Sequence, residues 1–191
     1  MAKEETLRLF IGAPLDHLQE QFCRLFVEEN EIEGIKWIPE KNWHITMLFL
    51  GNFQVTKLNA LKEVLKEIAA GFYQFGLSVD KFTYMPNPRK PTMIWQQYMV
   101  SAQFDYLLKG MLEFLKILFF DEGIPFNVSI RDVNIPHVTL SRLNNRVRNY
   151  PRLKQPRKIS SDIIITGFTL YASELNPGGA KYTVMESFRF S

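Results

Sequence analysis

Apolar and polar residues alternate along this chain in two periods, which predict strands interspersed with amphipathic helices. Apolar residues at every second position are typical of a strand, because successive side chains point to opposite faces of its sheet. Apolar residues three and four positions apart are typical of a helix that buries one side. The first period predicts strands at residues 7–12, 43–50, 75–84, 92–100, 126–131, 137–143, 163–173 and 181–190. The second period predicts helices over residues 14–26, 55–70 and 104–120.

Two turns divide this pattern. Residues 85–91 hold the densest run of prolines, and proline fits neither a helix interior nor a central strand. Residues 176–179 read Asn-Pro-Gly-Gly between two strands, and because no helix follows them we expect a hairpin turn rather than a phosphate-binding loop. Each half of the chain has a strand, a helix and then a His-bearing strand, which predicts a duplicated α+β fold of two lobes.

Composition limits the class of protein without naming a function. With 191 residues, 46% of them hydrophobic and 23% charged, the chain is an ordinary globular protein, which excludes wholesale disorder. We expect residues 1–191 to form a single two-lobed domain with its midpoint turn near residues 85–91. Cys23 is the single cysteine, which excludes an intrachain disulfide and a cysteine-based metal cluster, and we expect it to be buried as a small apolar side chain.

Net charge and hydropathy limit the partners and the cellular location that we expect for the protein. The net charge of +3 is a mild basic excess that does not by itself imply a nucleic acid. The first five residues lack the apolar core of a signal peptide, and no apolar run approaches the roughly 18 residues of a membrane span. We therefore expect a cytoplasmic protein that contacts no membrane.

Two of the three histidines begin the same four-residue pattern. His-Ile-Thr-Met occupies residues 44–47, and His-Val-Thr-Leu occupies residues 137–140, 93 positions later. In a strand, a residue and the second one after it project from the same face, so each copy presents an imidazole beside a hydroxyl. Two equivalent lobes would bring both pairs into one cleft. His17 has no threonine partner, and we expect it on the surface of a helix.

Two imidazoles and two hydroxyls suit acid–base hydrolysis of a phosphodiester without a metal. A neutral imidazole takes a proton from attacking water, an imidazolium gives one to a leaving oxygen, and hydroxyls donate to the charged oxygens between them. A metal site is the weaker interpretation, because only two histidines face each other and no carboxylate cluster lies near either motif. The remaining alternative is two unrelated histidines, each bonded to nearby backbone.

The segments around these motifs complete a resemblance that covers the whole chain. They are Arg-Leu-Phe-Ile-Gly at 8–12 with Pro14, Trp-Ile-Pro at 37–39 before the first motif, Pro136 and Ser-Arg at 141–142 around the second, and residues 170–182. With them the sequence resembles the RNA 2′,3′-cyclic phosphodiesterases, also called 2′-5′ RNA ligases, of the LigT-like 2H phosphoesterases. The resemblance implies two pseudo-symmetric lobes, each an antiparallel sheet with helices packed outside, around a central active-site groove.

The resemblance also implies roles for individual residues. His44 would be the general acid and His137 the general base, with Thr46 and Thr139 holding the phosphate. Arg142 would bind the phosphate as well. Strand parity opposes this last role, since Arg142 lies an odd number of residues from His137 and reaches the cleft only if the strand ends or bulges near Ser141.

Basic and aromatic residues add further candidates for substrate contact. Seven basic residues lie between positions 142 and 158, in a stretch from Asp132 to Asp162 that has no acidic residue between its ends. This stretch either contacts a phosphate backbone or is only a solvated loop. Phe10 projects from the first strand on the side opposite Leu9, where it either stacks on a base or packs in the core, and Trp95 has the same ambiguity.

The predicted function is hydrolysis of RNA ends that carry a 2′,3′-cyclic phosphate, giving a 2′-phosphomonoester. Water attacks phosphorus, His137 accepts its proton and His44 protonates the departing 3′ oxygen, without a cofactor or a metal. RNA ends or cyclic nucleotides are the expected substrates, and we expect a monomer. One alternative is 2′-5′ joining of RNA ends by the same residues. The other is a nucleotide-binding module with the same cleft and little catalysis.

Overall fold

The structure, a computed structural model, describes residues 5–125, 128, 134–143, 150–156, 162–176 and 179–191. Its strands are β1 (Thr6–Pro14), β2 (His44–Gln54), β3 (Phe75–Leu77), β4 (Val79–Met85), β5 (Met93–Tyr98), β6 (His137–Arg142), β7 (Ile163–Ile165), β8 (Gly167–Asn176) and β9 (Gly179–Arg189). Its helices are α1 (His17–Glu29), α2 (Leu58–Ala70) and α3 (Ala102–Asp121), with single 3₁₀ turns at Glu40–Asn42 and Val55–Lys57. The α+β class predicted from the sequence is confirmed.

Seven strands form one antiparallel sheet in the order β4-β5-β6-β2-β1-β8-β9, and β3 pairs with β7 in a second, small sheet. The large sheet has two parts, because β2 and β6 are joined through a single pair of residues, Ile45 and Val138. On one side of this junction lie β4, β5 and β6, and on the other lie β2, β1, β8 and β9. The two His-bearing strands are therefore the inner strands of the two lobes.

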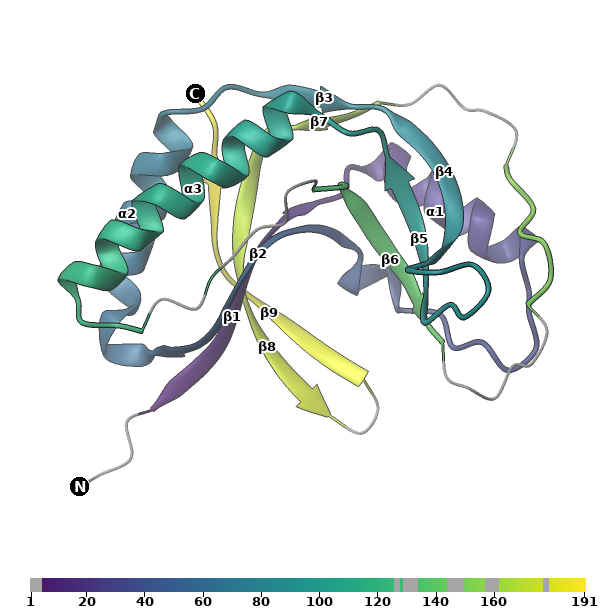
Figure 1. The fold of residues 1–191 in the computed structure, drawn as a ribbon, viewed down its shortest axis with the longest axis horizontal. Helices are drawn as coiled ribbons and strands as arrows, with labels where there is room; N and C mark the ends of the chain where they lie inside the picture. The colour runs from purple at the N-terminus through teal and green to yellow at the C-terminus, as the bar shows by residue number, and fades with distance from the viewer. Residues whose placement is uncertain (1–4, 126–127, 129–133, 144–149, 157–161, 177–178) are drawn as a thin grey trace.

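Helices cover the two lobes separately (Figure 1). Helix α1 packs on the β4-β5-β6 lobe, where the ring of Phe26 stacks on Phe82 with centroids 3.9 Å apart. Helices α2 and α3 lie side by side against the other lobe, and Phe119 of α3 meets Phe53 of β2. Burial of these faces forms one apolar core cluster through both lobes.

Helix α1 differs from the sequence prediction in its start and in its buried face. Pro14 still belongs to β1, and the helix begins after Asp16, whose side chain accepts a hydrogen bond from the backbone N–H of Gln19. Leu18 and Leu25, two residues of the expected apolar stripe, are exposed to solvent. The helix instead buries its remaining stripe together with a polar side chain, at Gln19, Phe22, Cys23 and Phe26.

Cys23 is fully buried, as predicted, and it donates a hydrogen bond to Gln96. Gln96 and Tyr98 both donate to the side-chain oxygen of Gln19. This buried polar network joins α1 to β5, and it explains how a helix can bury a glutamine. Apolar periodicity does not reveal such a residue.

Several strand boundaries also differ from the prediction. Strand β2 continues through Gly51, which adopts a φ of 72°, and the expected strand over 75–84 is two strands, β3 and β4. The strand expected at 163–173 is likewise divided into β7 and β8, which allows β7 to pair with β3. The strand expected at 126–131 falls almost wholly outside the described residues. The turn at 177–178 does too, although Asn176 and Gly179 pair across its ends as a hairpin requires.

No helix among the described residues combines the length and the apolar character needed to cross a bilayer.

Candidate active site

The single junction between the lobes brings the two repeated motifs together. Ile45 of β2 lies opposite Val138 of β6 in antiparallel pairing, and both side chains are completely buried. Neighbouring residues in each strand point to the other face, so His44 and Thr46 project on the same side as His137 and Thr139. The antiparallel register sets each histidine across from the threonine of the other motif. The structure thus places both imidazoles and both hydroxyls in one group.

Both imidazoles are oriented by the same kind of backbone contact. The Nδ1 atom of His44 lies 2.8 Å from the carbonyl oxygen of Asn42, and Nδ1 of His137 lies 2.8 Å from that of Ile135. In each case the carbonyl belongs to the second residue before the histidine. A carbonyl only accepts, so Nδ1 carries the hydrogen in both rings and Nε2 is the atom that exchanges a proton.

Both His-bearing strands contain a β-bulge at the same place in the motif. Met47 is the extra residue where β2 pairs with β1, and Leu140 is the extra residue where β6 pairs with β5. Each is the third residue after its histidine. Each is followed by a second buried residue, which shows that the alternation of faces is interrupted.

The bulges return the fifth residue after each histidine to the site face. These residues are Phe49 in β2 and Arg142 in β6, and both are exposed. Arg142 lies opposite Met93, which is two residues before Trp95 and so shares its face with the indole that contacts His137. The condition that the sequence set for Arg142, a bulge near Ser141, is therefore met.

His44 lies in a tight and largely apolar environment. Its Nε2 atom is 2.9 Å from the hydroxyl of Thr46, which completes the contacts of both ring nitrogens. Burial lowers the pKa of His44, the carbonyl of Asn42 opposes this shift, and the charge of Arg142 adds to the lowering. The resting site therefore favours the neutral form of His44. The effect of Arg142 also shows that its charge acts on the site face.

Two residues that the sequence did not single out help to place His44. A Cβ atom on Gly12 of β1 would lie 3.0 Å from Cδ2 of His44 and 2.9 Å from the oxygen of Ile45, so a glycine lets the imidazole lie against β1. The side chain of Asn42 donates to the carbonyl oxygen of Ala180 in β9, which fixes the turn whose carbonyl holds Nδ1. Neither role has a signal in the alternation of apolar residues.

An aromatic cluster surrounds His44. Phe10 lies next to it, and the centroid of the Phe10 ring is 4.9 Å from each of the ring centroids of His44, Tyr171 and Tyr182. Phe10 is 2% exposed, so its ring packs in the interior and offers no face to a base; of the two roles weighed from the sequence, the structure favours packing. The most exposed aromatic ring beside it is Phe49, which is 59% exposed with its centroid 6.0 Å from that of Phe10.

His137 has a different aromatic neighbour. The indole of Trp95 stacks on its imidazole, with ring centroids 3.5 Å apart and an angle of 14° between the planes. Trp95 is 5% exposed and lies in β5, opposite Thr139. This burial resolves the ambiguity of Trp95, which contacts a site histidine from below and is covered from solvent.

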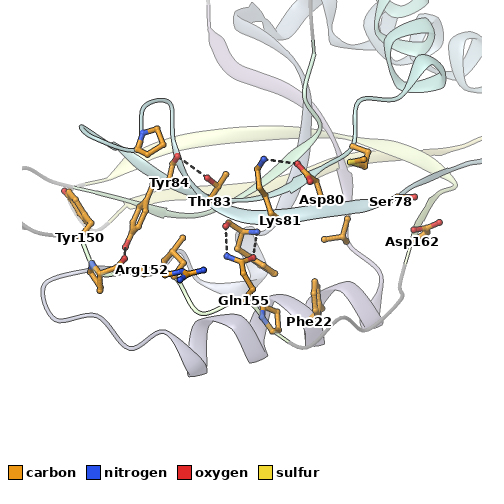
Figure 2. Close-up of a pocket in the computed structure, with 17 residues that line it drawn as sticks. Phe22, Ser78, Asp80, Lys81, Thr83, Tyr84, Tyr150, Arg152, Gln155 and Asp162 are labelled. Carbon is orange, nitrogen blue, oxygen red and sulfur yellow. Dashed lines mark hydrogen bonds and ion pairs between the residues drawn. The ribbon is translucent and has the colours of Figure 1, made fainter.

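A cavity lies away from these residues, along the outer edge of β4 (Figure 2). It has a volume of about 1040 Å³, and the segment 150–156 forms one wall, held by hydrogen bonds between the side chain of Gln155 and the backbone of Phe82. Its charged lining residues are balanced in sign: Asp80, Lys81, Arg152 and Asp162. None of the predicted site residues lines it, and its charge does not favour a polyanion.

Only part of the basic stretch falls within the described residues. Arg142 lies on the site face, while Arg152 and Lys154 belong to the segment beside β4. Arg146, Arg148, Arg157 and Lys158 lie outside the described residues. His17 is exposed at the start of α1, as predicted.

The donor set around the two histidines is imidazole and hydroxyl. Within the described ranges, no three side chains of the His, Cys, Asp and Glu types gather closely enough to hold a metal ion. The group that does gather can exchange protons and donate hydrogen bonds to an anion.

The sequence of this chain is similar to the sequences of known phosphoesterases. Residues 15–95, which include the first His motif, match the family model described as LigT like Phosphoesterase. An RNA 2′,3′-cyclic phosphodiesterase of Archaeoglobus fulgidus is 28% identical over 188 residues, which cover 95% of this chain and 99% of that protein.

Two solved structures show the same fold. The crystal structure of the protein TT0787 of Thermus thermophilus superposes with a TM-score of 0.78 and 25% identity, over 96% of this chain and 98% of that one. E. coli LigT complexed with 3′-AMP superposes with a TM-score of 0.74 and 23% identity, over 98% of this chain and 99% of that one. Over nearly its whole length this chain has the fold of these two structures, and residues 15–95 match the LigT-like phosphoesterase family in sequence.

Proposed function

We propose that this protein hydrolyses RNA 2′,3′-cyclic phosphate ends to 2′-phosphomonoesters by acid–base catalysis with two histidines and without a metal. The observation that carries the proposal is the group formed at the junction of the lobes. Two imidazoles, each with Nδ1 held by a carbonyl, lie on one face with two threonine hydroxyls. The similarity to enzymes named RNA 2′,3′-cyclic phosphodiesterase supports the choice of substrate.

In the proposed reaction the two Nε2 atoms act on opposite sides of the phosphorus. His137 takes a proton from water as its oxygen bonds to phosphorus. The bond from phosphorus to the 3′ oxygen breaks, and His44 gives that oxygen a proton. The product carries a 2′-phosphate and a 3′-hydroxyl, and one proton has passed from His137 to solvent and one from solvent to His44 before the next cycle.

The acid role requires His44 to be protonated, although the resting site favours its neutral form. A bound cyclic phosphate carries a negative charge close to the imidazole, and an opposite charge favours the protonated form. Substrate binding therefore prepares the acid. Loss of the phosphate charge from the site on product release would return His44 toward its resting state.

Thr46, Thr139 and Arg142 would hold the phosphate. The two hydroxyls lie beside the histidines, and the guanidinium is the cation on the same face at the fifth position of the second motif. A guanidinium can donate two parallel hydrogen bonds to phosphate oxygens, and charge on those oxygens increases as water attacks. Arg142 would thus offset the developing charge, while its own field keeps His44 neutral until substrate arrives.

The base of the terminal nucleotide would lie on the other lobe, against Phe49. This is the exposed ring next to the buried Phe10, and it occupies the position in the first motif that Arg142 occupies in the second. A base has an apolar π-face that stacks on such a ring without a sequence requirement. The stacking role first considered for Phe10 is therefore proposed for Phe49.

The proposal is tested with adenosine 2′,3′-cyclic phosphate in the presence and absence of EDTA, with the product identified by ³¹P NMR. We expect equal rates in both and a single 2′-phosphate signal. Loss of activity in EDTA that a divalent cation restores would refute the metal-independent mechanism, and a 3′-phosphate product would refute the assigned direction of cleavage. Addition of an RNA with a 5′-hydroxyl tests the ligase alternative, which predicts a 2′-5′ linked product.

A further inference from the structure

His137 is the one site histidine that a large aromatic ring covers face to face. Its imidazole and the indole of Trp95 are 3.5 Å apart at their centroids and 14° from parallel. Aromatic pairs in proteins commonly have centroids about 4.5–7 Å apart, so the two ring faces are in direct and nearly complete contact. The rings around His44 are tilted instead, by 37° for Phe10 and by 87° for Tyr182.

We propose that Trp95 is a positioning residue that fixes the plane of the His137 imidazole and stabilises its protonated form during turnover. The inference rests on the proposed function, in which His137 receives the proton of the attacking water. Trp95 itself touches neither water nor substrate, because it is 5% exposed and its indole nitrogen is buried. Trp95 acts on the reaction only through the imidazole of His137, which stacks on it.

Two contacts then define the orientation of His137. The bond from Nδ1 to the carbonyl of Ile135 fixes one edge of the ring, and the indole fixes the plane. A base that is held in a single orientation needs less reorganisation to reach the water it deprotonates. The strand register supports this arrangement, because Trp95 stands opposite Thr139 and so shares the site face with His137.

The indole face also has an electrostatic effect. Its π-system carries partial negative charge and attracts a cation placed over it, most strongly when the contact is buried. An imidazolium forms at His137 when it takes the proton, and the indole is already in place beneath it. The contact therefore favours the charged form that the reaction creates.

Other charged and titratable groups face the same region. His44 approaches from β2, and Arg142 lies on β6 itself. From β4, Lys81 is paired with Asp80, which accepts a hydrogen bond from Gln97 of β5, the residue opposite His137. All of these groups remain when Trp95 is replaced. A change in the pH at which His137 titrates therefore reports the effect of the indole on the imidazole.

Trp43 provides a matched control. It precedes His44 directly, is 7% exposed and belongs to the apolar core, and its indole nitrogen, like that of Trp95, has no partner among the described residues. Replacing either tryptophan by leucine removes an indole of similar burial next to a site histidine. Only the replacement of Trp95 removes a ring that stacks on an imidazole.

The experiment compares Trp95→Leu, Trp95→Phe and Trp43→Leu in the full chain. The first measurement follows the pH titration of His137 by ¹H–¹⁵N NMR without substrate, and the second follows kcat and KM for adenosine 2′,3′-cyclic phosphate against pH. Leucine keeps the apolar cover but not the π face, so we expect Trp95→Leu to titrate His137 at lower pH and to lower kcat by roughly 10-fold with KM unchanged. Trp95→Phe should recover part of both effects, and Trp43→Leu should change neither.

A His137 titration that stays in place or moves to higher pH in Trp95→Leu would overturn the proposal. Equal losses of kcat in Trp95→Leu and Trp43→Leu, with lowered melting temperatures, would also overturn it, because they would show a purely structural role. Should Trp95→Leu fail to fold, Trp95→Phe gives the same measurements with a smaller change of volume. A wild-type protein without phosphodiesterase activity would refute the proposed function instead, and the titration would still decide the role of Trp95.

Discussion

The two histidine motifs share a backbone and differ in what surrounds them. In both, a carbonyl two residues earlier holds Nδ1, a threonine follows at the second position, and a bulge occurs at the third. The fifth residue is Phe49 in one motif and Arg142 in the other. The first histidine lies among tilted aromatic rings, and the second lies on a stacked indole.

The shared backbone sets the geometry of the two histidines, and their different surroundings set the chemistry of each. The duplicated backbone aims two imidazoles at one place, which a symmetric pair would do equally well. A nucleoside 2′,3′-cyclic phosphate is not symmetric. It carries a nucleobase on one side, and its hydrolysis needs one general acid and one general base around phosphorus. An exposed aromatic ring at the fifth position of one motif and a cation at the fifth position of the other give the site the asymmetry that the substrate requires.

The largest effect should come from removing either imidazole. We expect His44→Ala and His137→Ala each to lower turnover by about 10²–10⁴-fold, because each leaves one proton transfer without a partner. His17→Ala, which removes the exposed histidine of α1, is the control and should keep full activity. Hydrolysis rates of adenosine 2′,3′-cyclic phosphate, with the fold followed by circular dichroism, give the measurement. Retention of wild-type turnover in either site variant would contradict the assignment.

Removing the cation of the second motif should have the next largest effect. Arg142→Met keeps much of the side-chain length but loses the charged hydrogen bonds to phosphate, which predicts a loss of roughly 10- to 100-fold in kcat/KM. Arg142→Lys should recover only part, because an ammonium lacks the planar fork. Arg152→Met, at the edge of β4, is the matched control. An equal loss in Arg152→Met would contradict the assignment, because it would show that the effect is not specific to the cation at the fifth position of the second motif.

The sequence predicts the architecture well because the strands of this fold bury alternate residues. The order of elements, the prolines near the midpoint and the hairpin at the end all leave local signals. Long-range effects leave none: the split of residues 75–84 into β3 and β4 depends on pairing with β7, nearly 90 positions later. The buried Gln19 is equally invisible, because its partners lie on β5.

The site residues, like the elements of the fold, divide into those that have a local sequence signal and those that have none. The paired His-x-Thr patterns identify the four central side chains, since strand parity is a local property. Parity fails at the bulges, where Leu140 and Ser141 are both buried, and this is why Arg142 looked misplaced and Phe49 was overlooked. Met47 and Leu48, consecutive apolar residues at the same place in the first motif, were the available sign of a bulge.

The pH dependence should show which motif supplies the acid. Burial and Arg142 lower the pKa of His44, so if His44 is the acid, the falling limb of kcat/KM lies below the ordinary value of about 6.5 for histidine. In the complex the phosphate charge raises that pKa, and the falling limb of kcat should lie at higher pH. Arg142→Met should move the falling limb of kcat/KM to higher pH, because it removes a cation that opposes protonation. Movement of the rising limb instead would make His44 the base.

The smallest effect should come from the aromatic fifth position, and it should depend on the substrate. Phe49→Leu keeps an apolar side chain but loses the ring, which predicts a rise in KM of about 5- to 10-fold for adenosine 2′,3′-cyclic phosphate through lost stacking. Methyl ribofuranoside 2′,3′-cyclic phosphate has the same reacting group without a base, and its kinetics should be unchanged. Phe114→Leu, which alters an exposed ring on α3, is the control for both substrates. Equal losses on the two substrates would mean that Phe49 supports His44 through Phe10, and the base would then have to be held by another part of the groove.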